Sequence, residues 1–422
     1  MSIFASTVNT YKIEGGVMSL KNAVGGVLLI AGTAIGAAVL ALPVSTSELG
    51  FVNATLYFVI TWIFMTLAAL YLLEANLREG YGSNIISMAR DSLGRSAELI
   101  AWLLYLVLFY ALNAAYFTGA GAWIYQAFQL IGISLPPIVC ALIAVGITFI
   151  IILTQIHSID LLNRLLMAGL LLAFGVMLFT AVPAVTRDLL LAPGHRLVLS
   201  PLPLMVTAFG FSIIVPTLTE YLHGRGSHLK YVILIGSLFP ILIYIIWEAL
   251  ILGIIPITGQ TSLTSLAASG KPAVEVAQAL SQLLELPWLT RAASVFSIFA
   301  LITSILGVSL SMFDFLADGL HQHKSFRGKL WLATLTFTPP LLFIVFYPEG
   351  FIYALNLAGV FVAILLGILP VMMVWQGRYR KKMPSSFRVC GGKPVLILTS
   401  LYFLGIIAIE VCELFKIPLP FL

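Results

Sequence analysis

The hydrophobic pattern of this sequence is a succession of long apolar runs separated by short polar segments. A membrane-spanning helix needs about 20 mostly apolar residues, and eleven runs fit that length. They cover residues 22–44, 52–74, 98–126, 136–155, 159–182, 200–222, 230–256, 290–320, 330–347, 350–375 and 394–415. The pattern therefore predicts an all-α polytopic membrane protein with eleven transmembrane helices.

Two of these runs are interrupted near their middle. Gly32 and Gly36 weaken the first run, and the sequence FGFS at 209–212, followed by Pro216, weakens the sixth. Backbone groups that lose their helical partners inside a bilayer must be buried in protein or line a cavity. Paired interrupted helices in two halves of a chain point to the binding site of a transporter. We therefore expect helices 1 and 6 to be discontinuous.

The positions of the two breaks also predict a repeat. Five spans in residues 22–182 would be followed by five in residues 200–375. An odd number of spans per repeat reverses the second half in the membrane, so we expect a 5+5 inverted repeat with helix 11 outside it. The remaining segments are a cytoplasmic N-terminal extension (1–21), an external linker (183–199), and a basic cytoplasmic loop with helix 11 (376–422).

Composition and charge support a membrane location. The chain is 60% hydrophobic and 9% charged, with a mean hydropathy of +1.07, which is more apolar surface than a soluble domain could bury. Positively charged loops stay cytoplasmic, which predicts a cytoplasmic N-terminus and an external C-terminus. On that reading most of the 22 Lys and Arg residues are cytoplasmic, and the net charge of +5 reflects orientation rather than nucleic-acid binding. The external ones are Arg187, Arg196, Lys271, Arg291 and Lys416.

The first break suggests a site for a zwitterion. We expect one half-helix to end at Ala31-Gly32, where free carbonyls attract an ammonium or a cation, and the next to begin at Ala37-Ala38, where free N–H groups attract a carboxylate. The break at Gly210 would offer the same groups from the other half. Close helix packing at the first break and a simple kink at the second are the alternative interpretations.

Side chains near the breaks would complete this site. Phe209 and Phe211 flank the second break, and Tyr110 and Asn113 share one face of the third span. A polar residue such as Asn113 within a span faces either a cavity or a neighbouring helix. The predicted substrate-binding residues are Ala31, Gly32, Thr33, Gly36, Ala37, Tyr110, Asn113, Phe209, Gly210, Phe211 and Ser212.

Three further residues are candidates for ion coupling. Glu248 lies deep in the seventh span and could bind and release a proton, or could be a neutral structural carboxyl. Thr303 and Ser304 in the eighth span could ligate sodium, or could bond back to their own helix. No HExxH, GxSxG or GxxxxGK motif occurs, which argues against a zincin, an α/β-hydrolase and an ATP-driven pump. We expect no enzyme activity, no resident metal and no cofactor.

Several short motifs together resemble one known family. The chain is similar to the hydroxy and aromatic amino acid permeases, and most to their tyrosine-specific branch, from about Met18 to the last span. The resemblance implies the LeuT-like inverted-repeat fold of the amino acid, polyamine and organocation transporters, a bacterial inner-membrane location, and import of aromatic amino acids, tyrosine foremost, by proton symport. The motifs are IAGTAIG (30–36) with Leu42-Pro43, DLLNR (160–164), AFGF (208–211) with Val215-Pro216, and LGV (306–308) with FDFLAD (313–318).

The sequence departs from the family pattern at two places. Ser212-Ile213 stand where that pattern has His-Gly, and Leu170 stands where it has Lys. Sodium-coupled symport of an aromatic or other neutral amino acid therefore remains an alternative, with the coupling ion either H⁺ or Na⁺. A channel or receptor without concentrative transport is a further alternative. The expected partners are a small-molecule amino acid and membrane lipid.

Overall fold

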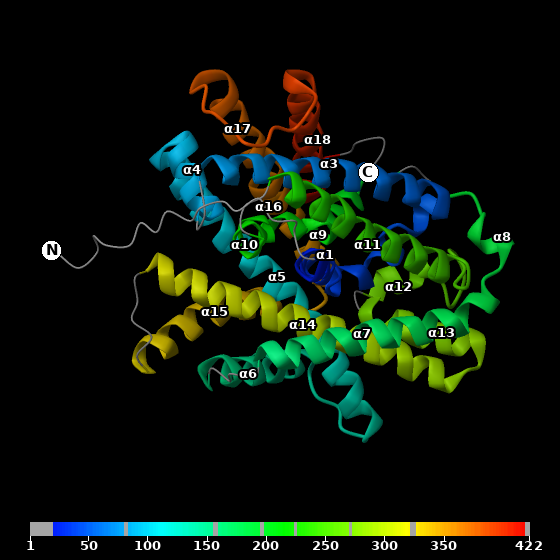
Figure 1. Cartoon of the computed structure of the whole chain (residues 1–422). Coiled ribbons are helices and arrows are strands. Elements are labelled where there is room, and N and C mark those ends of the chain that lie inside the picture. Colours follow the sequence, from blue (N-terminus) through cyan, green and yellow to red (C-terminus); the bar gives the residue numbers. More distant parts are fainter. Residues whose placement is uncertain are drawn as a thin grey trace.

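The computed structural model describes residues 20–79, 83–154, 159–194, 198–222, 226–269, 272–320 and 326–417, and the protein is helical over these ranges, with no strand among them (Figure 1). The longer helices are α1 (Leu20–Ala34), α3 (Gly50–Glu79), α4 (Ile85–Leu93), α5 (Arg95–Leu130), α6 (Pro137–Thr154), α7 (Ile159–Ala181), α11 (Gly226–Leu252), α13 (Pro272–Leu284), α14 (Pro287–Gly319), α15 (Phe326–Phe346), α16 (Phe351–Val362) and α18 (Gly392–Leu414). The shorter ones are α2 (Leu42–Ser45), α8 (Arg187–Leu190), α9 (Leu202–Ala208), α10 (Val215–Tyr221), α12 (Leu263–Ser269) and α17 (Leu369–Trp375).

Each of the predicted apolar runs coincides with helical structure. Among the described residues, nine helical segments are long and apolar enough to cross a membrane, and two shorter apolar helices, Asn22–Ala34 and Pro137–Leu153, fall in the first and fourth predicted runs. The tenth run is one long helix in which π-helical segments at Ala363–Ile368 (η5) and Gln376–Arg380 (η6) follow α16 and α17. The chain is thus a multi-pass membrane protein.

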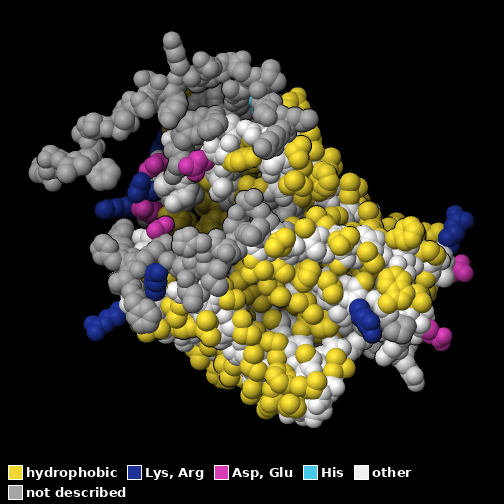
Figure 2. Space-filling model, turned by 60° about the horizontal axis from the view of Figure 1, so that its bottom comes forward, with side chains coloured by type: hydrophobic (Ala, Val, Ile, Leu, Met, Phe, Trp, Pro, Cys, Tyr) yellow, Lys and Arg dark blue, Asp and Glu magenta, His cyan; other side chains and the backbone are white. Residues whose placement is uncertain are grey.

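The surface of the bundle is suited to lipid. Large apolar side chains such as Phe179, Phe346 and Leu172 are 89%, 74% and 70% exposed. Figure 2 shows hydrophobic side chains spread across the face in view, while the Lys, Arg, Asp and Glu side chains lie towards its edges. Such a surface would be costly in water and is stable in a bilayer.

The first predicted span lies in the middle of the bundle (Figure 1). Helix α1 packs on α11, and α9 packs on α16. Both contacts need glycine, because a methyl group at Gly236 would lie 2.8 Å from the Ile30 side chain and one at Gly359 would lie 2.1 Å from the Pro203 carbonyl oxygen. Small residues let helices approach closely where the hydrophobic effect offers little drive for association.

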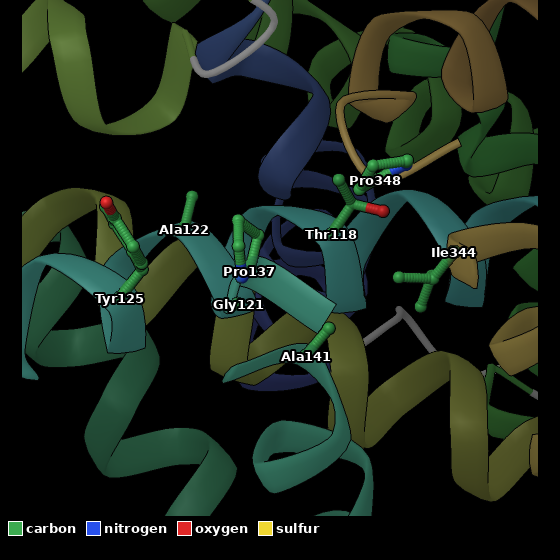
Figure 3. A pocket seen from close by; sticks show the side chains of 8 residues that line it. All are labelled: Thr118, Gly121, Ala122, Tyr125, Pro137, Ala141, Ile344 and Pro348. Carbon is green, nitrogen blue, oxygen red and sulfur yellow. The ribbon is translucent and has the colours of Figure 1, made fainter. Parts of the chain in front are cut away.

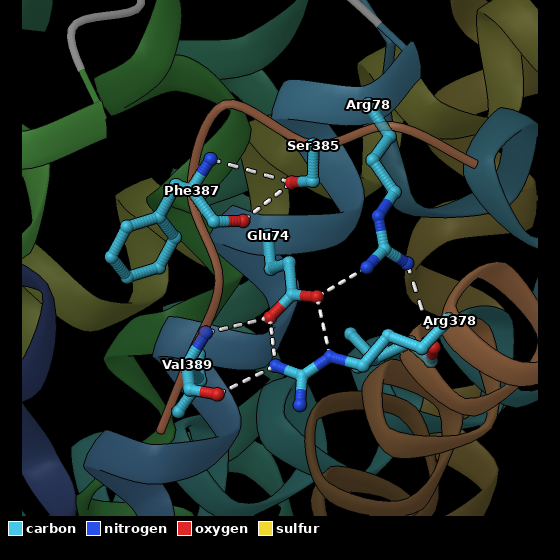
Figure 4. Close-up of polar contacts among 7 residues, drawn as sticks. Glu74, Arg78, Arg378, Ser385, Phe387 and Val389 are labelled. Carbon is cyan, nitrogen blue, oxygen red and sulfur yellow. Dashed lines mark hydrogen bonds and ion pairs between the residues drawn. The ribbon is translucent and has the colours of Figure 1, made fainter. Parts of the chain in front are cut away.

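A buried ion cluster fastens α3 to the end of the tenth run (Figure 4). The Glu74 carboxylate, which is fully buried, pairs with the guanidinium groups of Arg78 and Arg378. Its Oε2 atom also accepts a hydrogen bond of 2.8 Å from the Val389 N–H, and Arg378 Nη2 donates to the Val389 carbonyl at 2.8 Å. One carboxylate therefore joins a helix, a second helix and the loop that leads to α18.

We expect Glu74→Ala to destabilise the protein by about 3–5 kcal/mol, because it leaves two guanidinium groups buried without their partner. Thermal unfolding of the purified protein in detergent measures this. Asp91→Ala is the control, since Asp91 pairs with a half-exposed Arg90, and losing such a pair costs less than about 1 kcal/mol. Equal melting temperatures for the two variants would contradict the role given to the cluster.

Candidate functional site

The first broken segment interrupts the helix at Ile35-Gly36. Helix α1 runs to Ala34, the Ile35 N–H still donates to the Ala31 carbonyl at 2.9 Å, and Gly36 is extended (φ −127°, ψ −163°). The chain resumes as a 3₁₀ turn, Ala37–Leu40 (η1), and then α2. The predicted restart at Ala37 is confirmed, but the predicted end at Ala31-Gly32 is two residues too early, since α1 ends at Ala34. A single glycine costs a helix only about 1 kcal/mol, so α1 continues through Gly32 and uses the Ala31 carbonyl internally.

The second broken segment has a similar construction. Helix α9 ends at Ala208, a 3₁₀ turn spans Gly210–Ile214 (η4), and α10 follows with Pro216 in its first turn. Proline is tolerated there because first-turn N–H groups have no helical partner. The two broken segments touch, since α1 contacts η4 and η1 contacts α9. The breaks predicted from sequence are therefore present and adjacent.

A tyrosine on α11 joins the two breaks. The Tyr244 hydroxyl lies 2.6 Å from the Ala34 carbonyl oxygen and 2.9 Å from the Ala208 carbonyl oxygen, at the last residues of α1 and α9. Its ring meets Phe209 edge to face, with centroids 5.0 Å apart, and is fully buried. Tyr244 is not among the residues predicted from the sequence, where its only signal is a polar hydroxyl in an apolar span, one turn before Glu248.

The same face of α11 continues along the resumed part of the first segment. Trp247 Nε1 donates to the Val39 carbonyl at 3.0 Å. The fully buried Glu248 shares a hydrogen bond between its Oε1 and the Thr46 hydroxyl, and its Oε2 has no partner among the residues described. The three α11 side chains thus contact the first segment before, within and after its 3₁₀ turn.

The Thr46 hydroxyl has two acceptors and one hydrogen. Its oxygen lies 2.7 Å from the Leu42 carbonyl oxygen and also touches Glu248 Oε1. If Thr46 donates to Leu42, the second contact is satisfied only when the Glu248 carboxyl carries a proton and donates to the Thr46 oxygen. In that arrangement Glu248 is neutral and needs no ionised partner.

The two hydroxyl candidates on α14 behave differently. Thr303 bonds back to the Phe299 and Ala300 carbonyls at 2.8 and 3.1 Å, which is the structural alternative for that residue. The Ser304 hydroxyl instead accepts a 3.0 Å hydrogen bond from the Ala37 N–H, across the first break. Only Ser304 of this pair faces the site.

The aromatic and polar residues of the second break are deeply buried. Phe209, Phe211 and Ser212 are all 0% exposed. The Ser212 hydroxyl has no hydrogen-bond partner within the described ranges. An unpaired buried hydroxyl is costly, so a group that pairs with it would be favoured here.

Other predicted substrate contacts point elsewhere. The Tyr110 hydroxyl donates to the Leu335 carbonyl of α15 at 3.0 Å, and Thr33, on the exposed side of α1, bonds back to Leu29. Asn113 Oδ1 accepts from Ser309 of α14 at 2.6 Å, as its helix-packing alternative expected. Gly32 faces the Met167 side chain of α7. The structure thus places Ser304 beside Gly36 and Ala37, and the η4 turn against α1. Glu248 contacts Thr46 further along the first segment, while Tyr110, Asn113 and Thr33 bond to other partners.

Two cavities lie apart from these residues. A small one, of about 20 Å³, is lined by residues of α5 and α6 with Ile344 and Pro348 (Figure 3). A larger one, of about 450 Å³, lies between residues 189–194 and residues 252–258. None of the predicted substrate or ion residues lines either cavity. In the described part of the chain, no three His, Cys, Asp or Glu side chains gather into a metal site.

Comparison with known proteins identifies relatives across nearly the whole chain. The profile of the tryptophan/tyrosine permease family matches residues 19–412. Tyrosine-specific transport system 2 of Haemophilus influenzae is 32% identical over 389 residues, covering 90% of this chain and 94% of that protein. A tryptophan-specific transport protein of Pseudomonas aeruginosa is 30% identical, with 90% and 91% covered.

Solved structures are similar in fold. A manganese transporter of Eremococcus coleocola superposes with a TM-score of 0.64 at 15% identity, covering 96% of this chain and 89% of that one. At this identity the likeness concerns the fold alone.

We expect Gly36→Ala to destabilise the protein by about 1–3 kcal/mol, the usual range for overpacking, because the new methyl group would lie 2.8 Å from Ser304 Oγ. Gly210→Ala is the matched control, since its nearest neighbour would be 3.9 Å away. Thermal unfolding in detergent compares them, and the double variant Gly36→Ala/Ser304→Ala should melt above Gly36→Ala. A double variant that melts lower would show that the contact with Ser304 is not the cause.

Proposed function

The chain belongs to the tryptophan/tyrosine permease family, whose members are permeases and not enzymes, and we propose that it is a secondary transporter that imports an aromatic amino acid. The observation that carries this proposal is the pair of adjacent broken helices. Their ends present carbonyl oxygens at Ala34 and Ala208 and an N–H at Ala37. Groups of both polarities at one place suit a zwitterion.

In this proposal the amino acid binds between the two breaks. Its ammonium points to the carbonyls of Ala34 and Ala208, and its carboxylate points to the backbone at Gly36–Ala38. Phe209 and Phe211 offer aromatic surface for the side chain, and the unpaired Ser212 hydroxyl offers a polar contact. Alternating access would come from rocking of the two inverted halves, residues 22–182 and 200–375.

Tyrosine is the proposed first substrate. Relatives named for tyrosine reach 32–33% identity, while those named for tryptophan reach 28–31%. We place the protein in a bacterial inner membrane with its N-terminus in the cytoplasm, because the positively charged loops then lie inside.

Proton symport is the proposed mode of coupling, with Glu248 as the proton carrier. Glu248 is a buried carboxyl whose contact with Thr46 is satisfied by a proton, and α11 connects it to the carbonyls at both breaks. Sodium symport is the second candidate, because the Ser304 hydroxyl lies at the first break. A channel or receptor would not accumulate substrate at all.

Uptake of radiolabelled tyrosine into proteoliposomes, driven by an imposed pH gradient or an imposed sodium gradient, tests these proposals together. We expect a pH gradient, inside alkaline, to drive accumulation, and tryptophan and phenylalanine to compete. Accumulation driven by sodium alone would replace proton with sodium coupling. Equilibration without accumulation under either gradient would favour a channel, and no entry of any aromatic amino acid would refute the import proposal.

Glu248→Gln should reduce pH-driven accumulation at least about tenfold while preserving exchange of internal for external substrate, because the amide keeps the side-chain size but cannot carry the proton. Glu410→Gln is the control, since Glu410 is also buried, at 5% exposure, but lies on α18. Normal accumulation by Glu248→Gln would remove Glu248 from the coupling mechanism.

A further inference from the structure

The Tyr244 hydroxyl lies at hydrogen-bond distance from a carbonyl at each of the two breaks. It lies 2.6 Å from the Ala34 oxygen and 2.9 Å from the Ala208 oxygen. A phenol has one hydrogen, so it can make a full hydrogen bond to only one of the two carbonyls. The other carbonyl then faces the phenol oxygen without a hydrogen between them, and a second donor at this place would be more favourable. The Ala34 oxygen also accepts a 2.9 Å hydrogen bond from the Gly36 N–H, which leaves it one further acceptor position.

An ammonium group in place of the Tyr244 hydroxyl could donate a hydrogen bond to each of the two carbonyls. It has three hydrogens, and N–H···O hydrogen bonds have donor-to-acceptor distances of about 2.7–3.2 Å. A nitrogen at the position of the Tyr244 oxygen would reach both carbonyls at close to those distances. Ala34 and Ala208 are 4% and 2% exposed, so few other donors can reach their carbonyls.

We propose that the Tyr244 hydroxyl occupies the ammonium subsite in the substrate-free protein and withdraws from both carbonyls when an amino acid binds. This inference rests on the proposed function, since it takes the substrate to be an amino acid bound between the breaks. In this proposal Tyr244, from the unbroken helix α11, competes with the substrate ammonium for the two carbonyls.

The role of a placeholder has a physical reason. Carbonyls freed by a broken helix are costly in the core of a membrane protein unless something donates to them. The Ala34 oxygen already accepts a 2.9 Å hydrogen bond from the Gly36 N–H. Tyr244 adds a donor shared with the Ala208 carbonyl in the empty state and holds the ends of α1 and α9 together. Substrate binding then exchanges one donor for a better one, rather than filling a site that was left unsatisfied.

Withdrawal of the hydroxyl would also reach the proposed proton site. The Tyr244 ring is fully buried beside Phe58 and Phe209, with centroids 6.3 and 5.0 Å away. The hydroxyl can therefore leave only if the ring or α11 itself shifts. Trp247 and Glu248 lie on the same helix, so such a shift changes their contacts with Val39 and Thr46.

Tyr244→Phe tests the proposal through ligands that differ in one group. Binding of radiolabelled tyrosine to the purified variant is measured, with tyramine, which lacks the carboxylate, and 3-(4-hydroxyphenyl)propanoate, which lacks the ammonium, as competitors. Removing the placeholder should tighten tyrosine and tyramine binding about two- to tenfold, the range expected for one competing hydrogen bond. The propanoate should bind as it does to the wild type.

Tyr402→Phe is the matched control. It removes the hydroxyl of a partly buried tyrosine, which donates to Thr61 rather than to either break, and it should leave all three affinities unchanged. Weaker binding of tyrosine and tyramine by Tyr244→Phe would make the hydroxyl a direct ligand and overturn the proposal. Equal changes for all three ligands, or no change, would overturn it as well.

A second measurement covers the case in which Tyr244→Phe does not fold. 3-Fluorotyrosine placed at position 244 keeps the hydroxyl, and its ¹⁹F resonance should move on addition of tyrosine or tyramine but not of the propanoate. A shift with the propanoate as large as that with tyramine, or none with tyrosine, would refute displacement. Failure of the wild type to bind any aromatic amino acid would instead refute the proposed function.

Discussion

The hydrogen bonds from α11 to the backbone of the first broken segment are the constraint on which the site depends. Tyr244 and Trp247 donate to the carbonyls of Ala34 and Val39, which lie on either side of the break. In the interior of a membrane protein, backbone groups outside a helix cannot hydrogen-bond to water. The broken segment therefore persists at this depth because side chains of an unbroken neighbour add donors to its own backbone bonds, such as that from the Gly36 N–H to the Ala34 carbonyl.

Helix α11 thus contacts the backbone groups at the breaks and also carries the Glu248 carboxyl. The backbone groups at the breaks suit a zwitterion, and the carboxyl of Glu248 suits a proton. The side chains involved, Tyr244, Trp247 and Glu248, lie within five consecutive residues of α11. The buried cluster at Glu74 fixes α3 and the end of the tenth run, and α3 in turn packs on α11. Helix α3, which the Glu74 cluster holds in place, thus supports α11 and through it the site.

Hydropathy and local backbone rules were sufficient to predict the helical segments and both interruptions. The end of α1 was placed at Ala31-Gly32 rather than Ala34, because one glycine does not stop a helix whose neighbours pack well. Tyr244 and the Ser304 contact could not be predicted, since each depends on which helices lie side by side. The partners of Tyr110 and Asn113 could not be predicted for the same reason: the helical face they share turns to α15 and α14.

The most direct test of the account is a cryo-EM structure of the protein with tyrosine bound. The account predicts ligand density between the two breaks, with its amino nitrogen at hydrogen-bond distance from the Ala34 and Ala208 carbonyls and its carboxylate towards Ala37. Tyrosine found instead in the cavity between residues 189–194 and 252–258, with the bonds from Tyr244 to both carbonyls unchanged, would contradict it.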